Sequence, residues 1–555
     1  MAGQRGRGSS FRLALRQRDF RLLLSSLAVS TAGDWFYSVA LIVFVYDRTH
    51  SSAWIAATTI GRLAPYVVFG PLAGTIADRV DRRKLMIRID LMRAALMVAL
   101  AACAAATHSP LLAVSLAFAC SVAGTPQIPA MTALTPTVVP ESALTAANAL
   151  TGMADYLALA LGPALGTIAV MLGSPSIAFA INAAAFAASA VAMSMTQLPP
   201  VRRVDHVHEP FLRRAVGGVG LILRSPDTAV LAGFFVGQAW IYGLESVLLV
   251  LAAKSLLGIG IAGYGWLLAA IGAGGLLAAM GAGRFSEIRT PTLVLVAGVF
   301  AVGLPLASMS MIHHAWIAYV LLPLDGAGTL LTELLAITAL QRTIPEDKIA
   351  RTFAAMDSFA FAGVIAGSAI APLLIRFIGL RWALVVAGGS APVAALVCIP
   401  WLRNVDRLAR QRVEALGPTM RLLARSPVFE GTSSASLEML AGALTGVLVN
   451  AGSVVVREGE PATELFVIVN GHVTVHAGRD DDVITTLGPG DHFGEMGILE
   501  GVPRTATIRA ESTCALYRIR AADFLGVVNK SPVMRGTFRD VASSRHTQTT
   551  SRGSG

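Results

Sequence analysis

Twelve long apolar segments follow one another through the first 402 residues of the chain, separated by charged or glycine- and proline-containing breaks. A helix needs about 20 apolar residues to cross the hydrocarbon core of a bilayer, and each segment is long enough to do so. Because lipid offers no hydrogen-bond partner to an exposed backbone, each segment is predicted to be a transmembrane helix. The segments are 22–46, 53–76, 85–106, 111–134, 144–172, 176–197, 228–252, 262–282, 292–312, 315–338, 353–376 and 381–402.

The composition supports a multi-pass membrane protein. Only 14% of the 555 residues are charged and 54% are hydrophobic, whereas soluble domains carry about 25% charged residues. This balance excludes a single water-soluble domain, a disordered chain and a disulfide scaffold. The cysteines lack the spacing of a disulfide framework or a metal site, so no bound metal is expected. They are Cys103, Cys120, Cys398 and Cys514.

Arginine residues gather in alternate loops: before the first segment, after the second, and in the central loop 198–227. Basic loops stay on the cytoplasmic side, so both termini are expected in the cytoplasm. The formal net charge of +10 therefore reports orientation in a membrane, and no nucleic acid partner is expected. The alanine-rich, lysine-poor composition is typical of GC-rich bacteria, which favours the bacterial inner membrane, with the lipid bilayer as a partner.

The central loop divides the segments six and six, and Ser38-Val-Ala-Leu-Ile-Val resembles Ser246-Val-Leu-Leu-Val-Leu in the second half. Duplicated halves around a site near the membrane midplane are typical of transporters. The predicted parts are a basic N-terminal segment (1–21), two six-helix halves (22–197 and 228–402) joined by the loop, a helical linker (403–426), a β domain (427–545) and a disordered tail (546–555).

The loop after the second segment resembles the loop signature of the major facilitator superfamily. Its matching positions include Gly74, Asp78, Arg79, Arg82 and Arg83. A carboxylate beside arginines at a helix end forms an ion-pair latch that holds one arrangement of the inner face, and a plain positively charged anchor is the alternative. Asp81 stands where the family pattern has a second glycine; aspartate also adopts turn conformations.

A second resemblance lies in the fifth segment, where Gly162-Pro163-Ala-Leu-Gly166-Thr167 is similar to the antiporter signature of the superfamily's exporters. Glycine lets helices approach closely and proline bends them, so the segment serves as a hinge or as a packing seam. The motif Gly33-Asp34-Trp35 resembles the bacterial branch of macrolide and siderophore exporters. The resemblance implies export of a small-molecule substrate, with a proton or another ion as an open choice of coupling ion.

Charged residues inside the segments are candidate functional residues, because each costs about 2.5–3.5 kcal/mol to insert at a helix centre. The candidates for the transport pathway are Asp34, Arg62, Glu245, Asp325 and Glu333. Asp90 and Arg93 are three residues apart on one helix face, so they are expected to pair beside the loop signature. Asp155 and Asp357 are assigned to gating contacts.

After residue 427 the pattern changes to short alternating runs punctuated by glycines, which predicts an antiparallel β-roll with flanking helices. The stretch from Gly490 to Thr507 resembles the phosphate-binding cassette of cyclic nucleotide-binding domains. The resemblance implies that Glu495 accepts a hydrogen bond from the ribose 2′-hydroxyl and that Arg504 pairs with the cyclic phosphate. The implied site residues are Gly494, Glu495, Met496, Arg504, Thr505 and Ala506. Cyclic AMP and cyclic GMP both remain open as the regulatory ligand.

The sequence therefore predicts an all-α polytopic membrane protein with twelve helices and a 6+6 pseudo-repeat, followed by a β-roll sensor domain. The predicted function is secondary active transport by alternating access, regulated by a cyclic nucleotide. The alternative is a membrane-anchored nucleotide receptor whose helix bundle no longer transports. The sequence contains no nucleophile elbow, P-loop or metal-ligand cluster, so neither an enzyme nor a cofactor is expected.

Overall fold

The computed structural model describes residues 11–107, 109–140, 143–197, 220, 226–285, 291–343, 346–425, 429, 434–477 and 482–528. The chain divides into two compact units. The membrane unit consists of Phe11–Pro140 and Ala146–Asp406, and the second unit contains the chain from Arg407 onward. The other predicted domain boundaries stay predictions.

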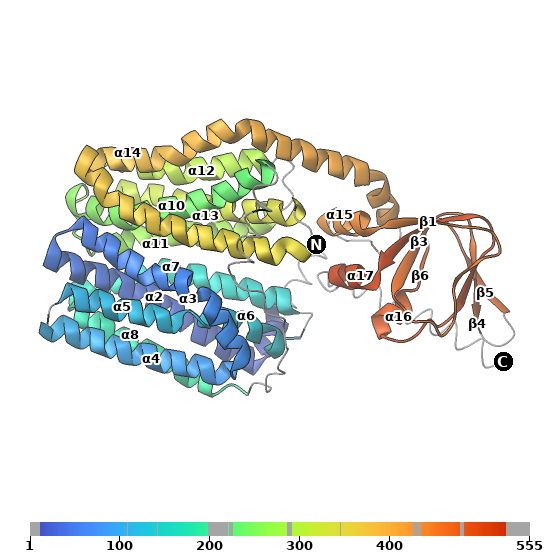
Figure 1. The fold of residues 1–555 in the computed structure, drawn as a ribbon, viewed down its shortest axis with the longest axis horizontal. Helices are drawn as coiled ribbons and strands as arrows, with labels where there is room; N and C mark the ends of the chain where they lie inside the picture. Colours follow the sequence, from blue (N-terminus) through green and yellow to red (C-terminus); the bar gives the residue numbers. More distant parts are fainter. Residues whose placement is uncertain are drawn as a thin grey trace. The chain divides into compact units, whose positions relative to one another are not determined.

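The first six predicted segments coincide with helices of the membrane unit. These are α2 (Arg18–Thr49), α3 (Ser52–Arg79), α4 (Arg82–Ala102) with a short π-helical end (Cys103–Thr107), α5 (Pro110–Gly124) with α6 (Gln127–Val138), α7 (Leu144–Leu172) and α8 (Pro175–Ser194). The fourth segment is divided between α5 and α6, because Pro126 has no N–H to continue the helical hydrogen bonds. Figure 1 draws this group in blue and cyan.

The second half of the membrane unit is also helical. Its helices are α10 (Pro226–Ser255), α11 (Tyr264–Phe285), α12 (Pro291–Ser308), α13 (Ala315–Thr343) and α14 (Glu346–Arg425). Gly379 interrupts α14 with a φ of 77°, a conformation that glycine adopts without steric cost. The break separates the eleventh and twelfth predicted segments, and the twelfth continues as helix to Arg425.

Among the described residues, nine helical stretches are long and apolar enough to cross a membrane. One of them, Ala355–Asn404, is 50 residues long and holds the two segments on either side of Gly379. Thr292–Ser308 is a shorter apolar helix, and the second predicted segment lies within α3. The predicted fold class, a polytopic helical membrane protein with a β domain, is confirmed.

The two halves of the membrane unit meet in a large apolar cluster. It joins the C-terminal end of α2, through Val39 and Ile42, to Leu248 on α10 and to residues on α11 to α14. A second cluster lies within the first half, around Phe179 and Phe186 of α8. Burial of these side chains holds the halves together at the end of the bundle where α2 ends and α3 begins.

Glycines on α7 allow it to pack directly against α2. A Cβ atom at Gly162 would lie 2.8 Å from the carbonyl oxygen of Ala32, and one at Gly166 would lie 2.5 Å from the carbonyl oxygen of Phe36. Pro163 lies between them, inside the helix. The motif that resembles the exporter signature therefore forms a close helix–helix seam, which favours the packing interpretation of these residues.

The seam predicts the effect of adding one methyl group. Gly166→Ala should lower the melting temperature of the detergent-solubilised protein by several degrees, because overpacking against backbone costs about 1–3 kcal/mol. Gly152→Ala, on the same helix, is the matched control, since nothing lies within 4 Å of its Cβ position. Thermal unfolding followed by circular dichroism compares the two; equal melting temperatures would contradict the seam.

The second unit contains two antiparallel four-stranded sheets. The strands are β1 (Thr445–Val449), β2 (Val454–Val456), β3 (Glu464–Asn470), β4 (Val473–Ala477), β5 (Asp482–Leu487), β6 (His492–Phe493), β7 (Thr507–Ala510) and β8 (Cys514–Arg520). One sheet has the order β1-β8-β3-β6 and the other β2-β7-β4-β5. Phe466 of β3 stacks on Phe493 of β6 with ring centroids 5.1 Å apart, within the apolar core of the roll.

Helices of the second unit pack against the roll through a separate apolar cluster. It joins Leu423, near the end of α14, to α15 (Ser434–Ala443), α16 (Glu495–Glu500) and α17 (Ala521–Val528). Helix α16 contributes Ile498 to the cluster, and α17 contributes Phe524 and Val528. The last turns of α14 therefore belong to the core of the second unit.

Candidate functional site

The six residues that resemble a nucleotide-binding cassette surround one cavity of about 180 Å³ in the second unit. Gly494, Glu495 and Met496 come from the start of α16, and Arg504, Thr505 and Ala506 come from the segment before β7. Strand pairing between β3 and β6 fixes the start of α16. The structure thus brings together every residue predicted for this site.

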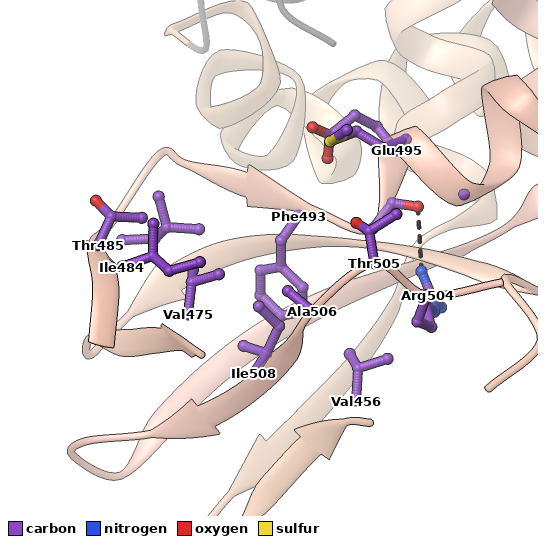
Figure 2. A pocket seen from close by; sticks show the side chains of 14 residues that line it. Val456, Val475, Ile484, Thr485, Phe493, Glu495, Arg504, Thr505, Ala506 and Ile508 are labelled. Atoms are coloured by element: carbon purple, nitrogen blue, oxygen red, sulfur yellow. Dashed lines mark hydrogen bonds between the residues drawn. The ribbon is translucent and has the colours of Figure 1, made fainter. Parts of the chain in front are cut away.

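Gly494 makes room for the arginine of this cavity. Its φ of 89° lies in the left-handed region that favours glycine, and it immediately precedes α16. A Cβ atom here would collide with the guanidinium group of Arg504. Arg504 Nη1 donates a hydrogen bond to the Gly494 carbonyl at 3.1 Å (Figure 2).

Arg504 is a buried cation held mainly by carbonyl oxygens. It is 7% exposed, and its Nη2 donates to the carbonyl of Glu464 at 2.7 Å. Its Nε has no partner among the described residues. Burial lowers the pKa of the Arg504 guanidinium, and the nearby carboxylates of Glu464, Glu460 and Glu495 oppose that shift. A buried cation with a spare donor, beside a cavity, suits an anionic ligand group.

The end of the cavity opposite Arg504 is largely apolar, and its residues Val475, Ile484 and Thr485 were missed by sequence reasoning. The remaining lining residues are Val456, Leu487, Phe493, Gly497 and Ile508. Figure 2 shows Arg504 and Thr485 at opposite ends of the group, with Phe493 and Ala506 between them. The signal that could have found them is strand alternation in β4 and β5.

A buried carboxylate completes the lining, since Glu495 at the start of α16 is 1% exposed. Together with Arg504 and the apolar end, it fits a ligand with an anionic group, a hydrogen-bond donor and an apolar part.

A second cavity, of about 250 Å³, lies in the membrane unit. Three of the predicted pathway residues line it: Glu245 from α10, with Asp325 and Glu333 from α13. The neutral lining residues Gln238, Tyr242, Tyr264 and Thr329 were not predicted, because a neutral residue in an apolar segment gives no charge signal. The structure thus joins acidic residues that are up to 88 positions apart in sequence into one site.

The other two pathway candidates, Asp34 and Arg62, do not line this cavity. The Asp34 carboxylate forms an ion pair with Arg93 of α4. Arg62 donates from Nε to the hydroxyl of Tyr37 at 3.2 Å and from Nη2 to the backbone carbonyl of Asp34 at 3.3 Å. Its guanidinium also lies over the Tyr37 ring, 4.9 Å from the centroid. These residues form a polar network within the first half.

The expected direct ion pair of Asp90 with Arg93 does not form: the two residues still influence each other electrostatically, but their direct contacts are with other residues. Arg93, 1% exposed, points to Asp34, donates to Gln127 Oε1 at 2.9 Å, and stacks 4.1 Å over the ring of Phe186. Asp90 accepts a hydrogen bond from the Ser189 hydroxyl at 2.6 Å. The correction has a geometric cause: packing of α2 and α8 against α4 brings better partners to each residue than the neighbour three positions away.

The loop signature is only partly described. Asp81 accepts a hydrogen bond from the Lys84 N–H at 3.1 Å and caps the start of α4, which explains why aspartate suits the glycine position. Arg83 donates to the carbonyls of Met193 and Ser194 at the end of α8, and Arg82 is partly buried. The surroundings of Gly74 and the side chains of Asp78 and Arg79 are not among those that the structure describes. The latch remains a prediction.

The two acidic residues assigned to gating have different neighbours. Asp155 of α7 lies beside Thr31 of α2. Asp357 of α14 is an electrostatic neighbour of Glu333, which places it near the acidic cavity. Their gating roles remain predictions.

A double-mutant cycle distinguishes the observed ion pair from the expected one. Asp34→Asn and Arg93→Gln should each destabilise the protein, and their effects should be non-additive by about 1–3 kcal/mol, because a direct charge contact is lost only once. The same cycle with Asp90→Asn in place of Asp34→Asn should give a smaller coupling. Thermal or urea unfolding in detergent measures both, and a larger coupling for Asp90 would overturn the assignment.

Comparisons with known proteins match the two units separately. A family model described as "Transmembrane secretion effector" matches residues 9–420, and one described as "Cyclic nucleotide-binding domain" matches residues 447–531. The membrane part is 27% identical over 385 residues to the MFS-type transporter YfiS of Bacillus subtilis, which is uncharacterized; the match covers 67% of this chain and 90% of YfiS. It is 21% identical over 393 residues to Macrolide efflux protein A of Streptococcus pyogenes, covering 70% and 97%.

The C-terminal part is 37% identical over 125 residues to a cyclic nucleotide-gated potassium channel of Mesorhizobium japonicum. That match covers 22% of this chain and 34% of the channel, so the chain spans about a third of such relatives. Among solved structures, a variant of the nucleoside transporter NupG matches with a TM-score of 0.58 at 12% identity, covering 69% of this chain and 99% of NupG. At that identity the likeness concerns the fold of the membrane unit.

Proposed function

Because the chain belongs to the transmembrane secretion effector family of major facilitator transporters and carries a cyclic nucleotide-binding domain, we propose that it is an exporter regulated by a cyclic nucleotide. The transporter alternates between inward- and outward-facing arrangements of its two six-helix halves. It lies in the bacterial inner membrane with both termini in the cytoplasm, and it performs no enzymatic step. The proposal depends on one observation: the same chain contains two cavities, one in the β domain beside the buried Arg504 and an acidic one in the membrane unit.

Two features support alternating access. The apolar cluster that joins the halves lies where α2 ends and α3 begins, which is the outer side in the proposed orientation. Packing of the halves at that end corresponds to a state closed to the outside. The acidic cavity lies between helices of the second half and α7, with Leu159 of α7 in its lining. Relative motion of the halves therefore changes the surroundings of this cavity.

The nucleotide would bind with its phosphate at Arg504 and its ribose at Glu495. The guanidinium fork suits the cyclic phosphate, and the unpartnered Nε supplies a further donor. The buried carboxylate of Glu495 accepts from the 2′-hydroxyl, and the base lies along the apolar end near Val475 and Ile484. Thr505 follows Arg504 directly, and the choice between cyclic AMP and cyclic GMP depends on this end of the cavity.

Loss of the arginine should weaken nucleotide binding. Arg504→Ala is expected to reduce the affinity for cyclic AMP and cyclic GMP about 10- to 100-fold, because charge-assisted hydrogen bonds to a charged group contribute about 1.5–3 kcal/mol. Arg509→Ala, an exposed position on β7 outside the cavity lining, is the matched control. Isothermal titration of the full-length protein in detergent measures both nucleotides, and an unaltered affinity in Arg504→Ala would refute the pocket.

A contiguous set of contacts can carry the effect of the nucleotide to α14. Glu495 begins α16, and Ile498, one turn later, packs in the cluster that contains Leu423 of α14 and Phe524 of α17. Displacement of α16 by a bound phosphate therefore repacks the end of α14. The same helix also forms the last two spans of the membrane unit. Regulation requires that the two transporter states bind the nucleotide with different affinities, typically by about 1–3 kcal/mol.

Transport measurements test regulation directly. In proteoliposomes, saturating cyclic nucleotide should change the efflux rate of a transported compound, while the Arg504→Ala protein should not respond. A panel of compounds that begins with macrolides supplies the substrate, because a related transporter is named for macrolide efflux. A rate that stays constant while calorimetry records nucleotide binding would contradict regulation. Absence of transport of any compound in the panel would favour the anchored receptor.

A further inference from the structure

The acidic cavity of the membrane unit points to the chemistry of its ligand. Three carboxyl groups line it, from Glu245, Asp325 and Glu333, and the lining contains no lysine or arginine among the described residues. The rest is largely apolar or aromatic, including Phe235, Leu268 and Ile271, with the rings of Tyr242 and Tyr264. We propose that this cavity binds an organic cation with an apolar body, and that the charged group of the ligand lies between Glu245 and Asp325.

Two of the three carboxyl groups have unmet hydrogen-bonding capacity. Glu245 is 7% exposed and Asp325 is 1% exposed. Glu245 Oε1 and Asp325 Oδ2 are buried and receive no hydrogen bond from another described residue, while Asp325 Oδ1 accepts from the Thr329 hydroxyl at 3.3 Å. The two carboxyl groups lie within hydrogen-bonding reach of each other, a contact that requires a proton on one of them. Buried oxygens without partners are costly, so they mark a place where a ligand or a proton completes the site.

The aromatic residues complete the cation site. Tyr242 lies one turn before Glu245 on α10, and Tyr264 lies at the start of α11 on the same cavity. Aromatic ring faces attract cations, most strongly where water is excluded. Two carboxylates beside aromatic rings and aliphatic side chains match an ammonium or phosphonium group that carries hydrophobic substituents. An anion would meet three carboxyl groups here and no lysine or arginine among the described lining residues.

Without such a ligand the Glu245–Asp325 pair must hold a proton, because two adjacent buried carboxyl groups cannot both be ionised. Binding a monovalent cation lets both ionise: the singly protonated pair takes up the cation and releases one proton, so the net charge of the site is unchanged. The other titratable groups facing the pair are Tyr242 on α10 and Tyr264 on α11. Glu333 lines the same cavity and neighbours Asp357 of α14.

One cation of the first half, Arg62, influences residues of this cavity but makes its hydrogen bonds elsewhere. Arg62 of α3 influences Tyr242 and Tyr264, but its own hydrogen bonds go to Tyr37 and to the carbonyl of Asp34. The negative charge of the cavity is thus available to a ligand. This inference rests on the proposed transport function, whose substrate it assigns to a chemical class.

Two ions of equal size and opposite charge test the inference. Tetraphenylphosphonium and tetraphenylborate are measured separately by equilibrium dialysis against the full-length protein in detergent. The phosphonium should bind and the borate should not. The phosphonium affinity should fall by up to about tenfold for each unit of decreasing pH where one proton is exchanged, and binding should release one proton. Equal binding of the two ions, or phosphonium binding without pH dependence and proton release, would overturn the proposal.

Substitutions of Glu245 and Asp325 test whether the phosphonium binds at these two residues. Glu245→Gln, Asp325→Asn and the double variant should each weaken phosphonium binding about tenfold or more, because a charge-assisted contact is lost. Asp47→Asn, an exposed acidic position near the end of α2, is the control and should bind as the unmodified protein does. Unchanged nucleotide affinity and melting temperature show that a variant is folded. Phosphonium binding by the folded double variant that equals that of the unmodified protein would overturn the assignment. If a variant does not fold, the comparison of the two ions and the pH dependence, both measured on the unmodified protein, test the proposal instead.

The outcome separates this inference from the proposed function. Nucleotide-dependent efflux of other compounds without phosphonium binding would refute the cation site and leave the regulated exporter. Phosphonium binding at the pair with no nucleotide effect on efflux would support the cation site and refute the regulation.

Discussion

A charge that leaves water must find a partner, and this constraint organises the membrane unit. Insertion of an unpaired charge at the centre of a membrane helix costs several kcal/mol, so charged residues of the bundle are expected beside a partner or a cavity. In the first half, Arg93 meets Asp34, Gln127 and the face of Phe186. In the second half, Glu245 and Asp325 face each other, and no lysine or arginine of the described residues lines their cavity. In the first half the charge of Arg93 is paired, whereas the acidic cavity of the second half is the site proposed to accept a positive charge.

The β domain also buries a charge beside a cavity, but there the charge is positive, whereas the membrane cavity is acidic. Arg504 is buried with two backbone carbonyls as acceptors and one donor unused among the described residues. The left-handed Gly494 allows this arrangement, because any side chain there would displace the guanidinium. The proposed ligands are thus a cation in one unit and an anion in the other, and α14 contributes residues to the cores of both units through Met356 and Leu423.

The sequence predicted the features that local physics dictates. The length of the apolar segments, and the need for every backbone group in lipid to be hydrogen-bonded, are sufficient to locate the spans. They also locate the break near Gly379. The nucleotide-site residues were predictable because they lie within 13 consecutive positions, 494–506. The strand β6 could not be predicted, since a strand of two residues shows no alternation. The pairing of Asp34 with Arg93, 59 positions apart, depends on helix packing that no local pattern encodes.

In the proposed function one chain couples its nucleotide site to its transport site, and thermodynamic reciprocity tests that coupling. The affinity for cyclic nucleotide is measured by calorimetry on the full-length protein, with and without a saturating concentration of a transported compound. Coupling predicts that the compound changes the nucleotide affinity by the same factor by which the nucleotide changes the affinity for the compound, about 5- to 150-fold. Identical nucleotide affinities under the two conditions would contradict the account.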